Sequence, residues 1–209
     1  MIGTTFKIGY RKIKKPLTTD YIAFFILISY LVGYIIGTSL IVSQSSVFVK
    51  FTGELVQNSF FNTLENGFFS TALKDYLGNF CFFLVAFIFG TSILGCIFVP
   101  AVNVFKGIKD GLLISFIYNT YSITGMGLSA LIIIPGAVLT AFLTLLALRE
   151  SICFSNKIFK NALPRGSSVN LSNQFKIYSI RYLILSLTLI LPSILNFTLA
   201  KIFIKYFQL

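Results

Sequence analysis

Long uncharged apolar runs recur along the chain and determine the architecture that the sequence predicts. Four of them have the length of a membrane-spanning helix, at residues 21–42, 79–99, 128–148 and 182–200. A helix of about 20 apolar residues crosses the hydrocarbon core of a bilayer. The first run is longer than the ~7–15 residues of a signal-peptide core, so we expect an uncleaved signal anchor. The pattern therefore predicts four spanning helices, with Pro135 and Pro192 inside the last two.

A shorter apolar stretch, residues 112–123, lies between the second and third of these runs. It reaches spanning length only when extended back to residue 105, which brings the charged residues of Lys106–Asp110 into the span. We expect an interfacial elbow after Pro100, then a helix over residues 105–123 whose basic end reaches the cytoplasmic headgroups. The alternative is a re-entrant piece that does not cross the bilayer.

Lys and Arg in the segments outside the apolar runs decide the orientation. Residues 1–20 carry five Lys and Arg against one Asp, and residues 149–181 carry six against one Glu. Residues 43–78 carry only two, against three acidic residues. Because cytoplasmic loops are enriched in Lys and Arg, both basic segments are expected inside and residues 43–78 outside. One crossing followed by three satisfies this distribution.

The fold prediction is thus an all-α, polytopic transmembrane helical bundle of about five spans with a cytoplasmic N-terminus, forming one membrane domain over residues 1–209. The extracytoplasmic segment 43–78 has apolar residues at helical spacing, which predicts one or two short amphipathic helices. They form either a docking surface for an external partner or a lid over helix ends. The cytoplasmic segment 149–181 is broken at residues 164–168 and predicts a basic interfacial helix, attracted to anionic lipid.

Composition narrows the functional class. Hydrophobic residues make up 56% and charged residues 11%, against roughly 45–50% and about 25% in soluble domains, which excludes a soluble enzyme. The chain contains no His, so neither a His-based zinc site nor a Ser-His-Asp triad can form. Cys81, Cys96 and Cys153 include no CxxC pair and are expected to be small hydrophobes in packed helices. We therefore expect no enzymatic activity, no cofactor and no metal.

The sequence also limits the partners. It contains no GxxxxGK[ST] phosphate loop, so any coupling to ATP needs a separate ATP-binding subunit. Topology explains the net charge of +11, and nucleic acid is not an expected partner. The expected partners are the lipid bilayer and other membrane or extracytoplasmic proteins. Assembly into a homo-oligomer stays open.

Two pairs of glycines have the spacing that lets membrane helices approach each other closely. Gly33 and Gly37 form a GxxxG motif in the first span, and Gly107 and Gly111 repeat it near the start of the third. Small residues at this spacing form helix–helix interfaces in membranes. Because glycine is common in membrane helices, incidental spacing is the competing explanation.

The charges beside the second glycine pair are candidates for a partner interface. Lys106 and Asp110 are i,i+4 neighbours and can pair. One hypothesis is an ion pair at a helix–helix joint that docks a partner, with Gly107 and Gly111 admitting the other helix. The alternative is a helix end at the cytoplasmic interface whose lysine snorkels to the headgroups. The same two explanations apply to Arg149 and Glu150 at the end of the fourth span.

An ordered series of small residues and prolines resembles the stage II sporulation protein M family of Firmicutes membrane proteins. The matching residues are Gly90–Gly95, Pro100, Phe105–Gly107, Gly111, Gly125, Pro135 and Ser151–Ser155. The resemblance covers roughly residues 79–155, and more loosely the last span with Gln174–Tyr178. The chain departs from the family at Gly136, where the sporulation proteins usually carry a polar residue.

The resemblance implies a five-span, non-enzymatic protein of the cell membrane. Members in endospore formers are scaffolds that recruit two peptidoglycan-remodelling partners, stage II sporulation proteins P and D, during engulfment. A second branch of the family lies beside ABC-type ATP-binding subunits in circular-bacteriocin clusters, where it supports peptide maturation, export or immunity. The chain is therefore expected to be an engulfment scaffold, or alternatively the membrane component of such an export or immunity system.

Overall fold

The computed structural model describes residues 18–43, 49–50, 52–54, 67–162 and 170–207, and every regular element in them is helical. The named elements are α1 (Thr18–Val42), α3 (Gly67–Gly90), α4 (Gly95–Leu128), the π-helix η2 (Ser129–Ile133), α5 (Ile134–Ala162), α6 (Leu171–Thr188) and α7 (Ile190–Phe207). No strand occurs among these residues. The prediction of an all-α fold is confirmed.

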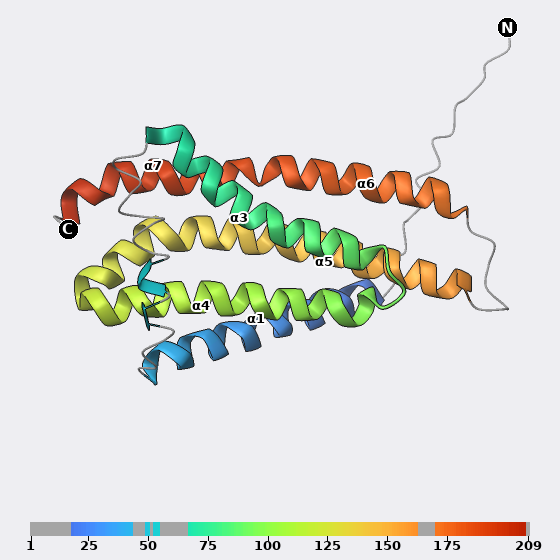
Figure 1. Ribbon diagram of the computed structural model, residues 1–209, viewed down its shortest axis with the longest axis horizontal. Helices are drawn as coiled ribbons and strands as arrows, with labels where there is room; N and C mark the ends of the chain where they lie inside the picture. Colours follow the sequence, from blue (N-terminus) through green and yellow to red (C-terminus); the bar gives the residue numbers. More distant parts are fainter. Residues whose placement is uncertain (1–17, 44–48, 51, 55–66, 163–169, 208–209) are drawn as a thin grey trace, which may run out of the picture.

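The helices run back and forth along one long axis (Figure 1). Helices α1, α3, α4 and α5 each make one pass, and α6 followed by α7 makes another. One end of the bundle holds the start of α1, the turn between α3 and α4, the end of α5 and the start of α6. The opposite end holds the end of α1, the start of α3, η2 and the end of α7. We call these the basic end and the far end.

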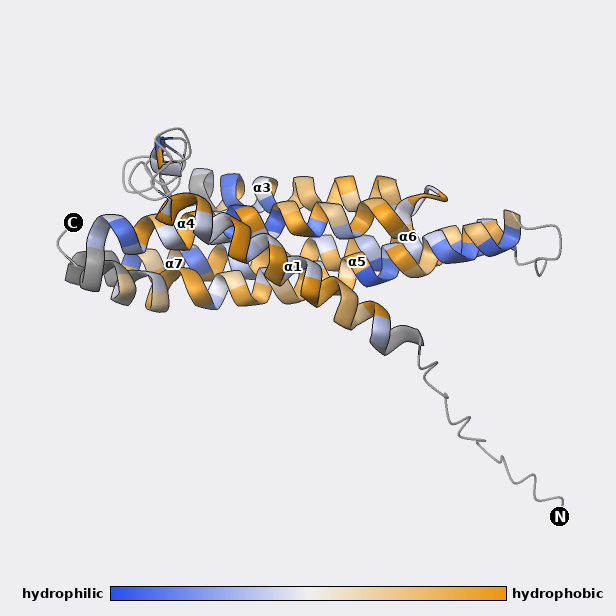
Figure 2. Ribbon diagram, turned by 90° about the horizontal axis from the view of Figure 1, so that it is seen from below, coloured by the Kyte–Doolittle hydropathy of each residue, from blue (hydrophilic) through white to orange (hydrophobic). Residues whose placement is uncertain are grey.

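Most of the bundle surface is apolar along its length, as Figure 2 shows by its colouring. Four stretches are long and apolar enough to cross a membrane: Tyr21–Val42, Ala72–Gly90, Ser129–Ala162 and Leu171–Ile202. Large side chains such as Phe24 and Phe142 are exposed on them. Helix α4 runs beside these stretches but carries charges. The chain is therefore a multi-pass membrane protein, a helical bundle of four to five spans.

The helix boundaries differ from the predicted spans at the basic end. The predicted span 79–99 is interrupted, because α3 ends at Gly90 and α4 begins at Gly95. The elbow expected after Pro100 lies instead in the turn of residues 91–94. Ser155 of α5 holds this turn, since its Oγ donates to the carbonyl oxygens of Ser92 (2.8 Å) and Ile93 (3.3 Å). Ser155 is separated from these two residues by 63 and 62 positions, so the pattern of residues within one helix cannot predict the contact.

The basic helix predicted after residue 149 is not a separate element. Helix α5 continues to Ala162, and Ser151 and Ser155 within it are buried. The predicted span 182–200 contains the break between α6 and α7 at Leu189. At the far end, η2 directly precedes Pro135. A proline ring would clash with the carbonyl of residue 131 in a regular α-helix, and a wider π-turn relieves this clash.

The alternation of the passes predicts that the two ends of the bundle lie on opposite sides of the membrane. Glu54 and Lys160 are exposed near the far end and the basic end, respectively. In a variant with Cys81, Cys96 and Cys153 replaced by Ser, we would introduce Glu54→Cys or Lys160→Cys. An impermeant maleimide should label position 54 in intact cells and position 160 only after permeabilisation. Labelling of both from one side would contradict the arrangement.

Candidate functional site

Helices α1 and α4 approach each other through the glycines that the sequence singles out. A Cβ added to Gly33 would lie 2.9 Å from the carbonyl carbon of Val104, and one on Gly37 would lie 3.0 Å from Cα of Ile108. Real Cβ atoms do not come this close to backbone. Both positions therefore require glycine for the observed packing.

The second glycine pair completes the same interface from the other side. A Cβ on Gly107 would lie 2.9 Å from the backbone nitrogen of Tyr34, and one on Gly111 would collide with the carbonyl oxygen of Tyr34. The two GxxxG motifs thus pack against one another, in the way that small residues allow in membranes. The helix that Gly107 and Gly111 admit is α1 of the same chain. These faces are consequently not free to receive a partner protein.

Asn103 adds a polar contact to this interface, one turn before Gly107. Its Nδ2 donates to the carbonyl oxygen of Ile26 at 2.7 Å and to Oγ of Ser29 at 3.0 Å. Asn103 and Ser29 are both buried. A buried amide that bonds the backbone of a neighbouring helix fixes the register of the two helices.

Lys106 and Asp110 form the predicted i,i+4 ion pair, with Nζ 3.3 Å from Oδ1. Their side chains are only 3% and 13% exposed. Because α4 begins at Gly95, the pair lies roughly 17–23 Å along the helix and not at its end. The expectation of a snorkelling helix end is therefore wrong. The lysine is enclosed inside the bundle.

Helix α1 supplies the second partner of this pair. The hydroxyl of Tyr30 donates to Oδ2 of Asp110 at 3.0 Å. Tyr30 is the tenth residue of the uncharged stretch Tyr21–Val42, about 14 Å from its start along a helix that spans about 33 Å. The ion pair therefore lies near the middle of the apolar zone.

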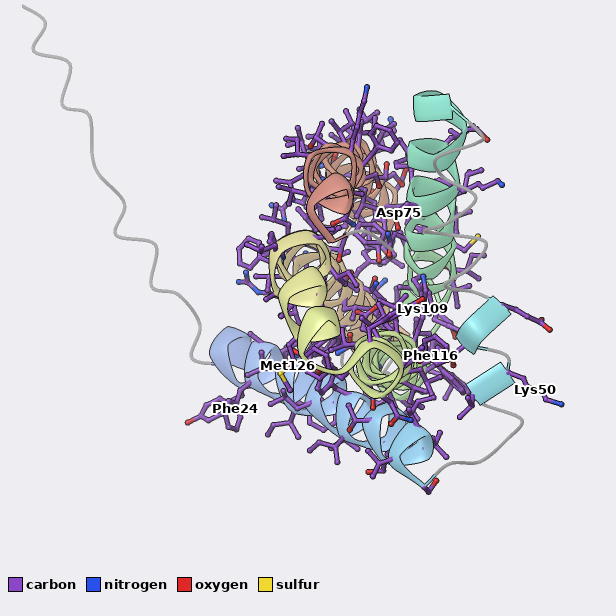
Figure 3. The ribbon with its side chains drawn as sticks, turned by 90° about the vertical axis from the view of Figure 1, so that its left-hand side faces the viewer. Phe24, Lys50, Asp75, Lys109, Phe116 and Met126 are labelled. Atoms are coloured by element: carbon purple, nitrogen blue, oxygen red, sulfur yellow. The ribbon has the colours of Figure 1, made fainter. Side chains whose placement is uncertain are left out.

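Helices α3 and α7 extend the network. Asn79 accepts a hydrogen bond from Nζ of Lys106 at 2.9 Å, and its Nδ2 donates to Oδ1 of Asp75 at 3.3 Å. The other oxygen of Asp75 accepts from Nδ2 of Asn196 at 3.4 Å. Figure 3 shows Asp75 between α3 and the helices facing it. We call this set the central polar network: Tyr30, Asp75, Asn79, Lys106, Lys109, Asp110 and Asn196.

Lys109 is the fourth ionisable member of the central polar network. Its Nζ lies 5.6 Å from the centre of the Phe82 ring, and Nζ of Lys106 lies 5.7 Å from the same centre. An aromatic face attracts a cation at this distance. With Asp75 and Asp110, the two lysines give a network without net charge. Such balance reduces the cost of placing charges in a bilayer, about 2.5–3.5 kcal/mol each at a helix centre on insertion scales.

Gly136, the residue after Pro135, leaves room for one member of the network. A Cβ on Gly136 would overlap the side-chain amide of Asn196. Glycine at this position, where the chain departs from the sporulation family, therefore leaves room for the amide that bonds Asp75. Pro135 itself lies just after η2, at the start of α5.

Arg149 and Glu150 do not act as a unit. Glu150 pairs with Arg181 of α6, with Oε2 2.7 Å from Nη1, and both side chains are open to the surroundings at 27% and 57% exposure. Arg149 lies apart from this pair and is partly exposed. The pair links α5 to α6 near the basic end and is separate from the central polar network.

A cluster of hydroxyl groups and aromatic rings joins α3, α5 and α6. The sequence had suggested no such cluster. Oγ of Ser151 lies 2.8 Å from the hydroxyl of Tyr182 and 3.1 Å from that of Tyr178. Tyr178 also donates to the carbonyl of Phe87 (3.2 Å) and stacks on Phe154. The sequence signal that could have indicated this cluster is a serine on α5 together with two tyrosines at i,i+4 spacing on α6, all within apolar stretches.

The described residues contain no group of three or more His, Cys, Asp or Glu placed to hold a metal ion. No protein-family model, curated protein or solved structure matches this chain. The features that bear on function are therefore the central polar network, the α1–α4 interface and the two ends of the bundle.

Replacing glycine in the α1–α4 interface should destabilise the bundle. Gly107→Ala adds one methyl group where the backbone of α1 leaves no room, so we expect a loss of about 1–3 kcal/mol, the scale of overpacking. Gly78→Ala is the matched control, because its Cβ would meet only Nζ of Lys109 at 3.8 Å. Thermal unfolding in detergent measures both. Equal midpoints for the two variants would contradict the close approach.

Breaking the buried ion pair should do more damage than breaking the exposed one. Asp110→Asn leaves Lys106 charged and enclosed, at an expected cost of about 3–5 kcal/mol. Glu150→Gln, in the exposed pair, should cost at most about 1 kcal/mol. The double variant Lys106→Met/Asp110→Leu should lose less stability than the sum of its two single variants, Lys106→Met and Asp110→Leu, which a double-mutant cycle measures. If Asp110→Asn unfolds no earlier than Glu150→Gln, the pair is not buried in the folded protein.

Proposed function

We propose that the chain is a non-enzymatic scaffold of the cell membrane that holds partner proteins at the ends of a stiff helical bundle. The central polar network is the observation that carries this proposal. It links α1, α3, α4 and α7, and its two lysines and two aspartates neutralise one another. Ionisable groups within spanning helices mark the pathway of an ion or substrate in many transporters. Here Lys106 and Asp110 pair with each other inside the bundle, which favours a static role.

The α1–α4 interface supports the same role. Both glycine faces are used inside the chain, so partner proteins have to bind elsewhere, at the ends or on the lipid-facing surfaces. At the far end, Gly53 lies beside the ring of Phe116 on α4, and Thr52 is buried. The connection between α1 and α3 is therefore attached to the bundle at this point. Residues 44–48, 51 and 55–66 of the predicted amphipathic segment lie outside the described residues.

The resemblance to the stage II sporulation protein M family gives the scaffold a specific form. In that form the far end, through the segment between α1 and α3, binds peptidoglycan-remodelling proteins outside the cell during engulfment. The basic end faces the cytoplasm. This assignment agrees with the position of the end of α5 and the start of α6, the described parts of the basic segment 149–181, at one end of the bundle.

One observation favours the second candidate, the membrane component of an ATP-driven bacteriocin or peptide export or immunity system. Ser155 contacts the turn between α3 and α4, so residues 156–162 of α5 project beyond that turn by roughly 10 Å. Lys157 bonds Gln174 of α6 at 2.8 Å, which joins the two helices into a projecting hairpin. A stiff hairpin on the cytoplasmic side would give an ABC-type ATP-binding subunit a place to dock and to transmit movement.

Photo-crosslinking at the two ends tests both candidates. A photoreactive amino acid would replace Glu54 or Lys160 in the full chain, in its native membrane, with Phe142 in the middle of the lipid-facing surface as control. The scaffold predicts peptidoglycan-active proteins at position 54 and no ATP-binding subunit at position 160. The export system predicts an ATP-binding subunit at position 160. Capture of no protein above the control at either end would contradict both.

A further inference from the structure

The basic end of the bundle carries an uncompensated positive charge on α5 and α6. Residues 149–162 and 171–182 contain five basic side chains and one acidic side chain. The acidic residue, Glu150, is paired with Arg181. Lys157, Lys160 and Lys176 are exposed and form none of the ion pairs found in the described part of the chain.

The exposed face of α6 marks where the membrane surface crosses this end. Asn173 and Lys176 are exposed in its first turns. Beyond Arg181, which is exposed and paired with Glu150, the exposed residues are apolar, namely Leu183, Ile184 and Leu187. Figure 2 shows the same change of colour along α6. A change from basic to apolar side chains on a lipid-facing surface is typical of the headgroup layer. This change favours a position of Lys176 near the lipid phosphates.

Lys157 lies at the same level and is held in place. Its Nζ donates to Oε1 of Gln174, two residues before Lys176 on α6. Glutamine carries no charge, so this bond orients the ammonium group without neutralising it, and two of its three donors stay available. A fixed ammonium group with free donors is a suitable partner for a phosphate oxygen.

Aromatic side chains accompany these lysines. Phe159 and Phe175 are 48% and 43% exposed, and each is adjacent in sequence to a lysine of the group. Alternating basic and aromatic residues suit the boundary between headgroups and acyl chains, where the rings enter the apolar layer and the lysines stay at the phosphates. Two exposed phenylalanines argue against a purely electrostatic contact with an acidic protein.

We propose that this surface, formed by Lys157, Phe159, Lys160, Phe175 and Lys176, binds the phosphate groups of anionic phospholipids in the adjacent leaflet. We call it the lipid collar. The collar is independent of which proposed function is correct, because both place this end at the cytoplasmic face. There, anionic lipids would hold the depth of the hairpin relative to the membrane surface.

Lipid binding to the purified full-length chain tests the lipid collar. Native mass spectrometry in detergent would compare adducts of phosphatidylglycerol and phosphatidylcholine on the natural chain and on Lys157→Gln/Lys176→Gln. A basic residue near an anionic surface contributes about 1 kcal/mol, which corresponds to about fivefold in affinity. The double variant should therefore lose about 25-fold in its preference for phosphatidylglycerol. Unchanged thermal unfolding would show that the variant is folded.

The matched control is Lys50→Gln/Lys74→Gln, which removes two exposed lysines near the far end and should keep the preference. Millimolar inorganic phosphate at constant ionic strength should not displace the lipid. The proposal is overturned if both double variants behave alike, or if free phosphate displaces the lipid. It is also overturned if the collar variant keeps its lipid preference but loses a protein crosslinked at position 160.

Discussion

An ammonium group and a carboxylate can lie in the middle of an apolar bundle only if the chain surrounds them with partners. For Lys106 and Asp110, two other helices meet this requirement directly and a third meets it through Asp75. Helix α1 brings the hydroxyl of Tyr30, α3 brings Asn79, and α7 reaches the same network through Asp75. Removing any of these helices would leave a charged or strongly polar group facing hydrocarbon, at several kcal/mol. The arrangement of the bundle thus follows from the need to surround Lys106 and Asp110 with polar partners.

The close approach of α1 and α4 makes that arrangement possible. A tyrosine hydroxyl on α1 reaches Asp110 because the backbones are separated by glycine and not by side chains. The interface and the ion pair therefore depend on each other. Their combined effect is a core with fixed register, joined at the basic end to a second fixed cluster around Ser151. These two regions restrict the relative movement of the helices that they join, in agreement with the proposed scaffold.

Local pattern in the sequence was sufficient for the passes, the glycine motifs and the Lys106–Asp110 pair. Each of these depends on residues within one helix. The errors arose where a distant residue decides the outcome. Ser155 places the turn at residues 91–94 instead of after Pro100. Tyr30 and Asn79, the uncharged partners of the ion pair, could not be identified from the sequence. Nothing in their own helices distinguishes them from other polar residues in apolar helices.

Tyr30 and Asp110 are separated by 80 residues in the chain, and this separation has a consequence for how the protein is made. At about 5–20 residues per second, α1 leaves the ribosome roughly 4–16 seconds before the segment that it binds. Until α4 is inserted, the glycine face of α1 has no α4 packed against it, and α3 is inserted during this interval. Helix α4 then arrives with charges that oppose its own entry into lipid. The glycine face of α1 and the hydroxyl of Tyr30 supply the packing and the polar partner that α4 lacks in lipid. The first helix to be synthesised thus serves as the insertion partner of the third pass.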